Sequence, residues 1–570
     1  MSEGNRLYYG DNLNILRDSI ESESVDLVYL DPPFNSSRDY NVIFKDESGN
    51  KSDAQLLAFE DTWRWGPSAE ETYAYLTNTS RHKGSVPDSV STLIAALRSG
   101  IGTNQMLAYI VEMTVRLGEL HRVLKATGSL YLHCDPTASH YLKVVLDAVF
   151  GPTNFRSEIV WKRTGAHSDT KQGRKIHGHI HDTLLYYTKS NDWKWNPIYL
   201  PLDRDYVEQF YRHVDSATGR MYRVDNLTAA KPGGDTSYEW HGVKPYKGRF
   251  WAYSKTNMEK FEAEGRLIYS KSGMPQYKRY LDESPGVPLQ DIWTDMSAIG
   301  SGSAERLGYP TQKPLALLER IIASSTDAGD TVLDPFCGCG TAVVAAQKLE
   351  RKWIGIDVTY LAIAVMKARL KDTFGLDDIP VLGQPTEVEG ARAFANSPEG
   401  RYQFQWWALN LIDATPVGGV QKKGADRGID GVITFTNEAG KMEGVLVSVK
   451  SGKVNSAQVR DLKGTVERDK AAIGLFITLD EPTKEMKLEA TTAGAYHSDL
   501  WNREYPKLQI LTIAELLSGR KPELPSFKSA PYQKAPKIRT KADQTGLFDQ
   551  PLAMVDEGEP DEPYAAESTE

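Results

Sequence analysis

A glycine-rich loop between an apolar segment and a helix is the feature that most restricts how this chain can fold. The apolar segment ends at Asp334, and Gly338 and Gly340 follow it, where a backbone without a Cβ can turn sharply and approach a ligand closely. The residues from Thr341 onward have the composition of a helix, and the next apolar strand ends on Asp357, twenty-three residues after Asp334. This spacing predicts a nucleotide-binding βαβ unit of an α/β sheet, with an acid for the ribose diol.

The same loop argues against phosphate binding. Glycine loops of this kind also bind NAD and nucleoside triphosphates, so the loop alone does not identify its ligand. However, no Gly-Lys-Ser or Gly-Lys-Thr follows it, and Phe336 stands where a G-x-G-x-x-G pattern has its first glycine. Phosphate binding is therefore the poorer interpretation.

A second short string lies about three hundred residues earlier. The apolar run Val25–Leu30 predicts a buried strand that delivers Asp31 to its carboxyl end, where open α/β sheets place their chemistry. Pro32 and Pro33 lack backbone N–H groups, so the turn is stiff and presents carbonyl oxygens. The Asp31 carboxylate and the Pro32 carbonyl could accept the two hydrogens of an amino group, and Phe34 offers a flat face for a base. The alternative is an ordinary Pro-Pro turn with a buried phenylalanine.

The order of these strings resembles the DNA amino-methyltransferases of the permuted beta group, in which D-P-P-F/Y precedes an F-x-G-x-G cofactor loop. Other segments similar to that family are Leu7–Asn12, Gly128–Asp135, Glu158–Arg163 and Thr311–Leu315. The resemblance covers most of residues 1–375. It implies a Rossmann-like, S-adenosylmethionine-dependent methyltransferase domain there, with a target-recognition region inserted at about 160–305.

The resemblance also implies roles for individual residues. The target base would be flipped out of duplex DNA and held by Asp31, Pro32, Pro33 and Phe34. The residues implied in cofactor binding are Asp11, Lys313, Asp334, Phe336, Gly338, Gly340, Thr341 and Asp357. An Asp before the two prolines favours adenine, and hence N6-methyladenine, whereas N4-methylation of cytosine stays the alternative. The transfer itself needs no metal.

Composition fits a DNA-modifying enzyme of the cytoplasm. The 570 residues suffice for two or three domains, and three cysteines without a C-x-x-C pair argue against disulfides and zinc. We expect a cytoplasmic protein of bacterial, archaeal or phage origin, because no targeting segment or membrane span is visible. The net charge is -9, but residues 156–189 hold seven Lys and Arg against three Asp and Glu. Such a local basic surface is what phosphate contacts require.

Aromatic and basic residues continue through the expected target-recognition region, for example in 240–251, and suit contact with duplex DNA. The histidines at 177, 179 and 181 could suggest a metal, although a DNA-facing edge is the better interpretation. Residues 36–105 form an insertion after the predicted strand that ends at Asp31. It could be a flap over the extruded base or a homodimer contact, or else a packed surface excursion. The alternatives in this part of the chain stay open.

A second domain is expected at 399–520, after a linker at 376–398. Asp430 at one strand and Lys450 on the next resemble the Mrr-type branch of the PD-(D/E)xK nuclease fold, a smaller α/β domain in which the acid binds Mg²⁺. Ser448 departs from that pattern, because an acid or amide normally supplies the second ligand. Either Glu399 or Gln405 replaces it, or the domain binds DNA without cutting. An active nuclease would instead make the chain a single-chain restriction-modification enzyme.

The tail 521–570 is expected to be disordered and acidic, with seven acids and no base after Pro551. Within it, Gln544, Leu547 and Phe548 resemble the short peptide that docks onto the bacterial sliding clamp, although coincidence is the better interpretation.

For the chain as a whole, two further alternatives to a DNA methyltransferase are a methyltransferase acting on RNA or protein and a DNA-binding module without catalysis.

Overall fold

The computed structural model describes residues 4–33, 65–165, 175, 177–231, 236–300, 302–307, 309, 311–376, 378–396, 400–416, 428–436, 442–498 and 502–525. The chain forms two compact units, of which one comprises Met1–Lys194 with Ile292–Glu570 and the other Trp195–Asp291. Among the described residues, no helix combines the length and the apolar character that a membrane span needs. Phe34 and the segment 544–548 lie outside the described residues.

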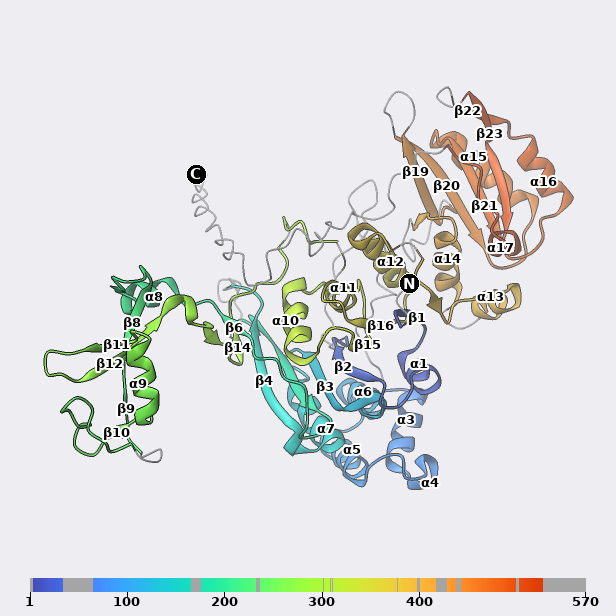
Figure 1. Ribbon diagram of the computed structural model, residues 1–570. Coiled ribbons are helices and arrows are strands. Elements are labelled where there is room, and N and C mark those ends of the chain that lie inside the picture. The colour runs from blue at the N-terminus through green and yellow to red at the C-terminus, as the bar shows by residue number, and fades with distance from the viewer. Residues whose placement is uncertain are drawn as a thin grey trace, which may run out of the picture. The chain divides into compact units, whose positions relative to one another are not determined.

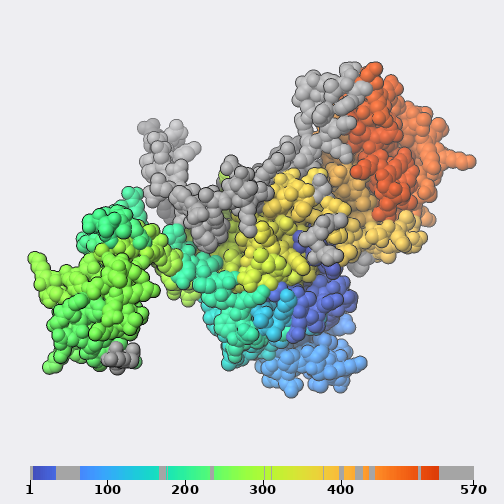
Figure 2. Space-filling view, viewed as in Figure 1, coloured from blue at the N-terminus to red at the C-terminus, as the bar shows by residue number. Residues whose placement is uncertain are grey.

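A nine-stranded sheet forms the centre of the first unit, in the order β14-β4-β5-β3-β2-β15-β16-β1-β17. Its strands are β1 (Arg6–Tyr9), β2 (Val25–Leu30), β3 (Leu124–Cys134), β4 (Phe155–Lys162), β5 (His181–Thr188), β14 (Ile292–Trp293), β15 (Thr331–Asp334), β16 (Lys352–Asp357) and β17 (Val381–Leu382). All neighbours pair parallel except β5, which is antiparallel to both β3 and β4. Strands from the start of the chain and from residues 331–357 therefore lie side by side, and Figures 1 and 2 show the dark blue and yellow segments next to each other. The predicted α/β architecture is confirmed.

Helices flank this sheet and bury its apolar side chains. They are α1 (Asn12–Ser19), α3 (Pro67–Thr77), α4 (Thr79–His82), α5 (Asp88–Ile101), α6 (Gln105–Val123), α7 (Ser139–Phe150), α10 (Leu315–Ser325), α11 (Thr341–Lys348) and α12 (Tyr360–Phe374). A large core combines the strand residues Val28 and Leu132 with α6 and α7. Leu76, Val90 and Ile94 belong to the same core. The described part of the predicted insertion is therefore packed into the unit.

Two expected boundaries differ from the structure. The segment predicted as a linker, 376–398, contains β17, which pairs with β1 and extends the sheet, and α13 (Val388–Ala395). The predicted inserted region, 160–305, is larger than the separate unit Trp195–Asp291, because β5, β14 and the end of β4 belong to the main sheet. The sequence signal there was basic and aromatic composition, which does not distinguish an edge of the sheet from an inserted unit.

The second unit consists of short strands around a small aromatic core. A four-stranded sheet has the order β11-β12-β8-β7, with β11 (Leu267–Tyr269), β12 (Pro275–Tyr280), β8 (Met221–Asn226) and β7 (His213–Val214). The other elements are β6 (Tyr199–Leu200), α8 (Arg204–Phe210), β9 (Thr228–Ala229), β10 (Phe250–Trp251), α9 (Lys255–Ala263), η2 (Leu281–Glu283) and β13 (Val287–Pro288). Trp240 and Trp251 are buried in its core.

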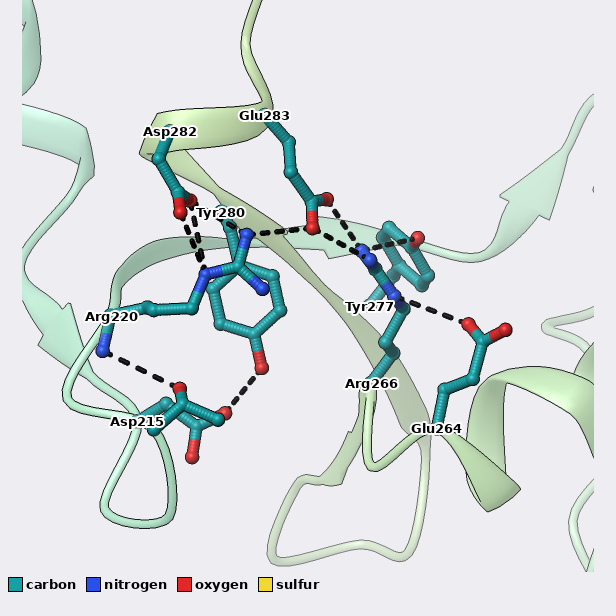
Figure 3. A network of polar contacts seen from close by, with 9 residues as sticks. Asp215, Arg220, Glu264, Arg266, Tyr277, Tyr280, Asp282 and Glu283 are labelled. Carbon is teal, nitrogen blue, oxygen red and sulfur yellow. Dashed lines mark hydrogen bonds and ion pairs between the residues drawn. The ribbon is translucent and has the colours of Figure 1, made fainter.

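A network of ion pairs ties the strands of the second unit together, as Figure 3 shows. Arg220 contacts Asp282 and Glu283, and Arg266 contacts Glu283 from the other side at 2.7 Å. The hydrogen bond from Arg266 and the charges of both arginines hold the pKa of Glu283 at about 2. The acids of this network are therefore already paired within the unit.

The last described part of the chain forms a five-stranded sheet in the order β18-β19-β20-β21-β24. The strands β22 (Ala495–Ser498) and β23 (Arg503–Pro506) form a separate two-stranded sheet. The other elements of this part of the chain are α14 (Gly400–Asn410), β18 (Thr415–Pro416), β19 (Gly431–Thr436), β20 (Met442–Lys450), α15 (Ser456–Arg468), β21 (Ile473–Thr478), α16 (Lys484–Thr491), β24 (Leu508–Thr512) and α17 (Ile513–Leu517). β19 and β20 pair antiparallel, so residues near the end of β20 lie beside the start of β19. This register brings Asp430 close to Lys450.

Candidate active site

Four aspartates lie at the carboxyl ends of neighbouring parallel strands. Asp11 follows β1, Asp31 follows β2, Asp334 ends β15 and Asp357 ends β16. These four strands are consecutive in the sheet in the order β2-β15-β16-β1, so the two sequence motifs share one edge of the sheet. The structure therefore brings together the residues that the sequence placed three hundred positions apart.

Asp31 is in an ion pair with Lys313. The Nζ of Lys313 donates to Oδ2 of Asp31, and both side chains are largely buried. Lys313 lies just before α10, where the Glu305 carboxylate accepts the backbone N–H of Leu315 at 2.6 Å. The expected contact of Lys313 with a cofactor stays a prediction, and in this structure its ammonium group pairs with the acid of the Pro-Pro turn.

The glycine loop has the sharp turns that its sequence predicts. Gly338 and Gly340 have φ angles of 49° and 75°, which favour glycine. A Cβ at Gly340 would lie 2.6 Å from Cγ of Met366, and a Cβ at Gly338 would lie 3.1 Å from the ring of Tyr309. Both positions are therefore restricted by close neighbours as well as by conformation.

Thr341, at the end of this loop, is buried and has a structural partner. Arg369 of α12 donates to Oγ1 of Thr341 at 3.1 Å and to the carbonyl of Cys339 at 3.2 Å. Phe336, at the start of the loop, packs partly buried against the main core. These contacts stabilise the loop from the protein side.

Asp357 also shapes the loop. Its carboxylate accepts the N–H of Gly338 at 2.9 Å and both the N–H and the hydroxyl of Thr359 at 2.8 Å. The backbone N–H of Val358 also lowers the pKa of this carboxylate, so donors of the chain surround Asp357. Burial raises the pKa of Asp357, although these hydrogen bonds oppose the shift.

Asp334 is buried beneath the loop, where it accepts the N–H of Phe336 at 3.0 Å. Its pKa is raised well above the usual range, first by burial and then by the charges of Asp31 and Asp357. Asp334 is therefore a buried acid with two further carboxylates close by, of which Asp31 pairs with Lys313. Such a site favours a cation and disfavours a phosphate.

Asp11 is held by a buried arginine that the sequence analysis did not single out. Its carboxylate caps α1 through the N–H groups of Leu13 and Asn14 and pairs with Arg116 of α6 at 2.9 Å. Arg116 also donates to Oδ1 of Asn12 at 2.7 Å and pairs with Glu112 at 2.9 Å.

The amide of Asn12 in turn donates to the carbonyl of Pro335 at 2.8 Å. This chain of contacts fixes the segment after β1 against the glycine loop. Arg116 and Tyr309 carry no local motif, so only their positions in the fold identify them.

The carboxylate of Asp430 is surrounded by hydrogen-bond donors. It accepts from the N–H of Val449 at 2.6 Å and from the amide of Gln405 at 3.2 Å, and Lys450 lies 3.6 Å away. The Ser448 hydroxyl is 3.5 Å from Oδ2. Within the described residues, no group of three or more His, Cys, Asp or Glu side chains could hold a metal ion. Gln405 therefore lies where the sequence analysis sought a replacement ligand, but it donates to the acid, and Glu399 lies outside the described residues.

Comparison with known proteins identifies the family. Residues 25–366 match a family model described as DNA methylase. The chain belongs to this family. Residues 416–518 match a second model, described as NACHT-associated inactive Restriction Endonuclease 1, so the C-terminal part is restriction-endonuclease-like, and the narrower Mrr-type assignment stays a prediction.

Curated relatives agree with this family assignment. The type II methyltransferase M.EcaI of Enterobacter cloacae is 32% identical over 46% of this chain and 57% of its own length. The Mod subunit of the type III restriction-modification enzyme StyLTI of Salmonella typhimurium is 26% identical over 60% of this chain and 50% of its own length. The type II methyltransferase M.HpaI of Haemophilus parainfluenzae is 40% identical over 63% of this chain and 73% of its own length. The chain thus spans between half and three fifths of the length of the first two of these relatives.

Proposed function

We propose that this protein is an S-adenosylmethionine-dependent DNA methyltransferase that methylates the exocyclic amino group of adenine. The carrying observation is that the Asp31 turn and the glycine loop lie at the ends of adjacent strands, β2 and β15. Membership of the DNA methylase family supports the reaction class. The choice of adenine as the target base rests on the Asp before the two prolines, and cytosine is the alternative target.

The acids at this edge fit S-adenosylmethionine. That cofactor carries a sulfonium charge and a ribose diol and has no phosphate, and it supplies an activated methyl group. Asp334 contributes a buried carboxylate with a raised pKa, and Asp357 contributes a second carboxylate at the end of the neighbouring strand. Asp11 is only half-buried, so its carboxylate is accessible beside the loop. We assign the binding of the cofactor to these acids together with the loop glycines.

The Asp31 turn would orient the amino group. Because Pro32 and Pro33 have no N–H, the turn offers acceptors and no competing backbone donors. The Asp31 carboxylate and the Pro32 carbonyl accept the two amino hydrogens, which directs the nitrogen lone pair towards the methyl group. Lys313 must then share Asp31 with the amine. Phe34 remains the proposed stacking residue.

The test is a labelled-methyl assay across duplex DNA, RNA and protein, with Asp31→Ala as the variant. We expect the parent to label duplex DNA and Asp31→Ala to lose labelling while it retains most cofactor affinity. Single-molecule sequencing of DNA from an expressing host then identifies the modified base and its surrounding sequence. Labelling by Asp31→Ala at the parental rate would contradict the proposal. If the sequencing finds methylated cytosine and no methylated adenine, the enzyme is an N4-cytosine methyltransferase, which is the alternative.

For the C-terminal domain we propose a non-cutting role. The donors around Asp430 occupy the carboxylate that a metal would need, and the matching family is described as inactive. Magnesium-dependent cleavage that is lost in Asp430→Ala or Lys450→Ala would instead show a single-chain restriction-modification enzyme. A homodimer, a cytoplasmic location and clamp binding through 544–548 also stay proposals, and deletion of 544–548 with a clamp pull-down tests the last.

A further inference from the structure

One stretch of chain contacts both halves of the candidate active site. Its described residues are 305–307, 309 and 311–314, and they lead into α10. The ring of Tyr309 lies against the glycine loop, where a Cβ added to Gly338 would be 3.1 Å from it. Four residues later, Lys313 pairs with Asp31 of the Pro-Pro turn. We call this stretch the 305–314 connection, because it reaches both the cofactor loop and the Asp31 turn.

The side chain of Gln312 closes the 305–314 connection on itself. Its Oε1 accepts the N–H of Leu307 at 2.9 Å, and its Nε2 donates to the carbonyl of Glu305 at 2.8 Å. One amide therefore satisfies a backbone donor and a backbone acceptor that no helix or strand satisfies here. Gln312 thus ties the start of the connection to the residue directly before Lys313.

Glu305 joins the connection to α10 and to the cofactor side. Its Oε1 accepts the N–H of Leu315 at 2.6 Å, at the first turn of the helix, where backbone donors have no partner within the helix. The same oxygen lies 4.0 Å from the guanidinium group of Arg369. Arg369 in turn donates to the carbonyl of Cys339 and to Thr341 of the glycine loop. Glu305 therefore lies between the helix that follows Lys313 and the arginine that supports the loop.

The backbone of Thr311 shows that the connection is held in a conformation that its sequence does not favour. The φ angle of Thr311 is 63°, in the left-handed region, which is rare for a β-branched residue. Such a conformation persists only where surrounding contacts enforce it. The two bonds of Gln312 are such contacts, and the ammonium group of Lys313 lies 3.5 Å from the carbonyl oxygen of Thr311. Without the bonds of Gln312, Thr311 should relax and displace Lys313.

The two parts of the site that the connection touches must keep a fixed separation during methyl transfer. In the proposed function the Asp31 turn holds the amine and the glycine loop holds the methyl donor. The amine nitrogen and the methyl carbon react in line, so a displacement of about 1 Å can slow transfer about 100-fold. The pairing of β2 with β15 fixes the two strand ends, and the connection bridges the turns that follow them.

We propose that Gln312 and Glu305 are positioning residues that set the separation between the Asp31 turn and the cofactor loop. The inference rests on the proposed function, because this separation matters only if a methyl group passes between the two. Gln312 acts through Lys313, and Glu305 acts through the start of α10 and through Arg369. Neither was among the residues that the sequence assigned to the cofactor or to the target base.

The test compares Gln312→Ala with a matched control, Gln509→Ala. The Gln509 amide makes the same pair of bonds in the C-terminal part of the chain, to the carbonyl of Glu523 at 2.8 Å and from its N–H at 2.9 Å. Glu305→Ala is compared with Glu305→Gln, whose amide oxygen can still accept the N–H of Leu315. The single-turnover rate of methyl transfer to duplex DNA is measured with saturating cofactor, well below each thermal midpoint. The Kd for S-adenosylmethionine is measured separately.

We expect Gln312→Ala and Glu305→Ala to slow transfer at least about 10-fold, with a cofactor Kd within about threefold of the parent. Glu305→Gln should stay within about twofold of the parental rate, because it keeps the hydrogen bond. Gln509→Ala should lower the thermal midpoint without slowing transfer.

Three results would overturn the positioning role while the parent still methylates DNA. They are a parental rate in Gln312→Ala, an equal loss of rate in Gln509→Ala, and an equal loss of rate in Glu305→Gln and Glu305→Ala. A parent that transfers no methyl group to duplex DNA would contradict the proposed function itself, and the inference with it.

Discussion

Lys313 and Asp31 lie 282 positions apart in sequence and form an ion pair at the carboxyl edge of the sheet. The ammonium group also lies close enough to affect Asp334 and Asp182 electrostatically. Lys313 is therefore the cation that several acids of the site share. Without it, Asp31 would be a largely buried carboxylate beside other negative charges.

We predict that Lys313→Met slows methyl transfer at neutral pH by at least about 10-fold. Without the ammonium group, the Asp31 carboxylate loses the partner that fixes it at the turn, so it should orient the target amine less well. Lys348→Met is the matched control, because Lys348 pairs with the buried Glu319 at 2.7 Å away from the Asp31 turn. Steady-state rates of both variants at neutral pH check the prediction, and a parental rate for Lys313→Met would refute it.

Arg116 is the second cation whose removal should be costly. We predict that Arg116→Met lowers the free energy of unfolding by about 3–5 kcal/mol, because it leaves the largely buried Glu112 carboxylate without its cation, although the Thr72 hydroxyl still donates to it. Cofactor affinity should fall as well, since Asp11 and Asn12 lose the group that holds them. Urea unfolding and calorimetric titration with S-adenosylmethionine measure the two effects.

The control for Arg116 is a more exposed ion pair of the same unit. Arg17 pairs with Glu119 at 3.3 Å and is about one third exposed. Arg17→Met should cost less than about 1 kcal/mol. Equal losses of stability in both variants would contradict a special role for Arg116.

The sequence predicted the parts of the site that follow strands, and not the parts that reach it across the fold. β2, β15 and β16 and the glycine turns follow from local patterns of apolar residues, glycine and proline. Arg116 and Tyr309 were missed because a residue within a helix or a long connection carries no motif for a distant contact. His133 lay in a recognised segment, but its partners Tyr29 and Asp182 come from β2 and β5 and depend on strand order, which a pattern of single segments does not contain.

The buried acid Asp334 should make stability depend on pH. Its folded pKa is raised above the unfolded value, so its contribution to stability is fully present at pH below the unfolded pKa and is lost as pH rises through the folded pKa. We therefore predict that Asp334→Asn raises the free energy of unfolding at pH 7 and has less effect near about pH 4. The amide oxygen can still accept the N–H of Phe336.

Denaturant unfolding at both pH values checks this prediction. Asp330→Asn is a control for which the opposite change in stability is expected. Asp330 pairs with Lys194 at 2.5 Å, so removal of its charge should destabilise the protein. Cofactor affinity should fall in Asp334→Asn, since an amide cannot ionise when a sulfonium binds beside it. A variant that is less stable than the parent at pH 7 would show that Asp334 is compensated in a way that its contacts do not reveal.

The donors around Asp430 predict that magnesium does not stabilise the parent protein. Ser448→Asp would place a second carboxylate near Asp430, which should lower the thermal midpoint without metal and make millimolar Mg²⁺ stabilising. Ser448→Asn has nearly the same shape without the charge, so it should show no response. Thermal unfolding with and without MgCl2 distinguishes these cases, and a parent stabilised by Mg²⁺ would contradict the non-cutting proposal.

A turn of the second unit should contact DNA phosphates. Trp240 and Trp251 are buried at its two ends, and the guanidinium of Arg249 donates to Oγ1 and the carbonyl of Thr228, both at 2.7 Å. The turn is therefore well anchored. Its exposed residues include Lys244, Tyr246 and Lys247, and Tyr246 is 53% exposed. Two lysines beside an exposed aromatic ring suit the negative backbone of duplex DNA.

We predict that Lys244→Ala with Lys247→Ala weakens DNA binding and flattens its salt dependence. Each phosphate contact contributes about 0.9 to the slope of log affinity against log salt concentration, so the double variant should lose about 2. Lys260→Ala on α9 is the control, because Lys260 faces Glu264 at 3.9 Å and is equally exposed. Fluorescence anisotropy at several salt concentrations measures the slopes. An unchanged slope in the double variant would place the DNA contact elsewhere, whereas a loss confined to it would assign both lysines to the phosphate backbone.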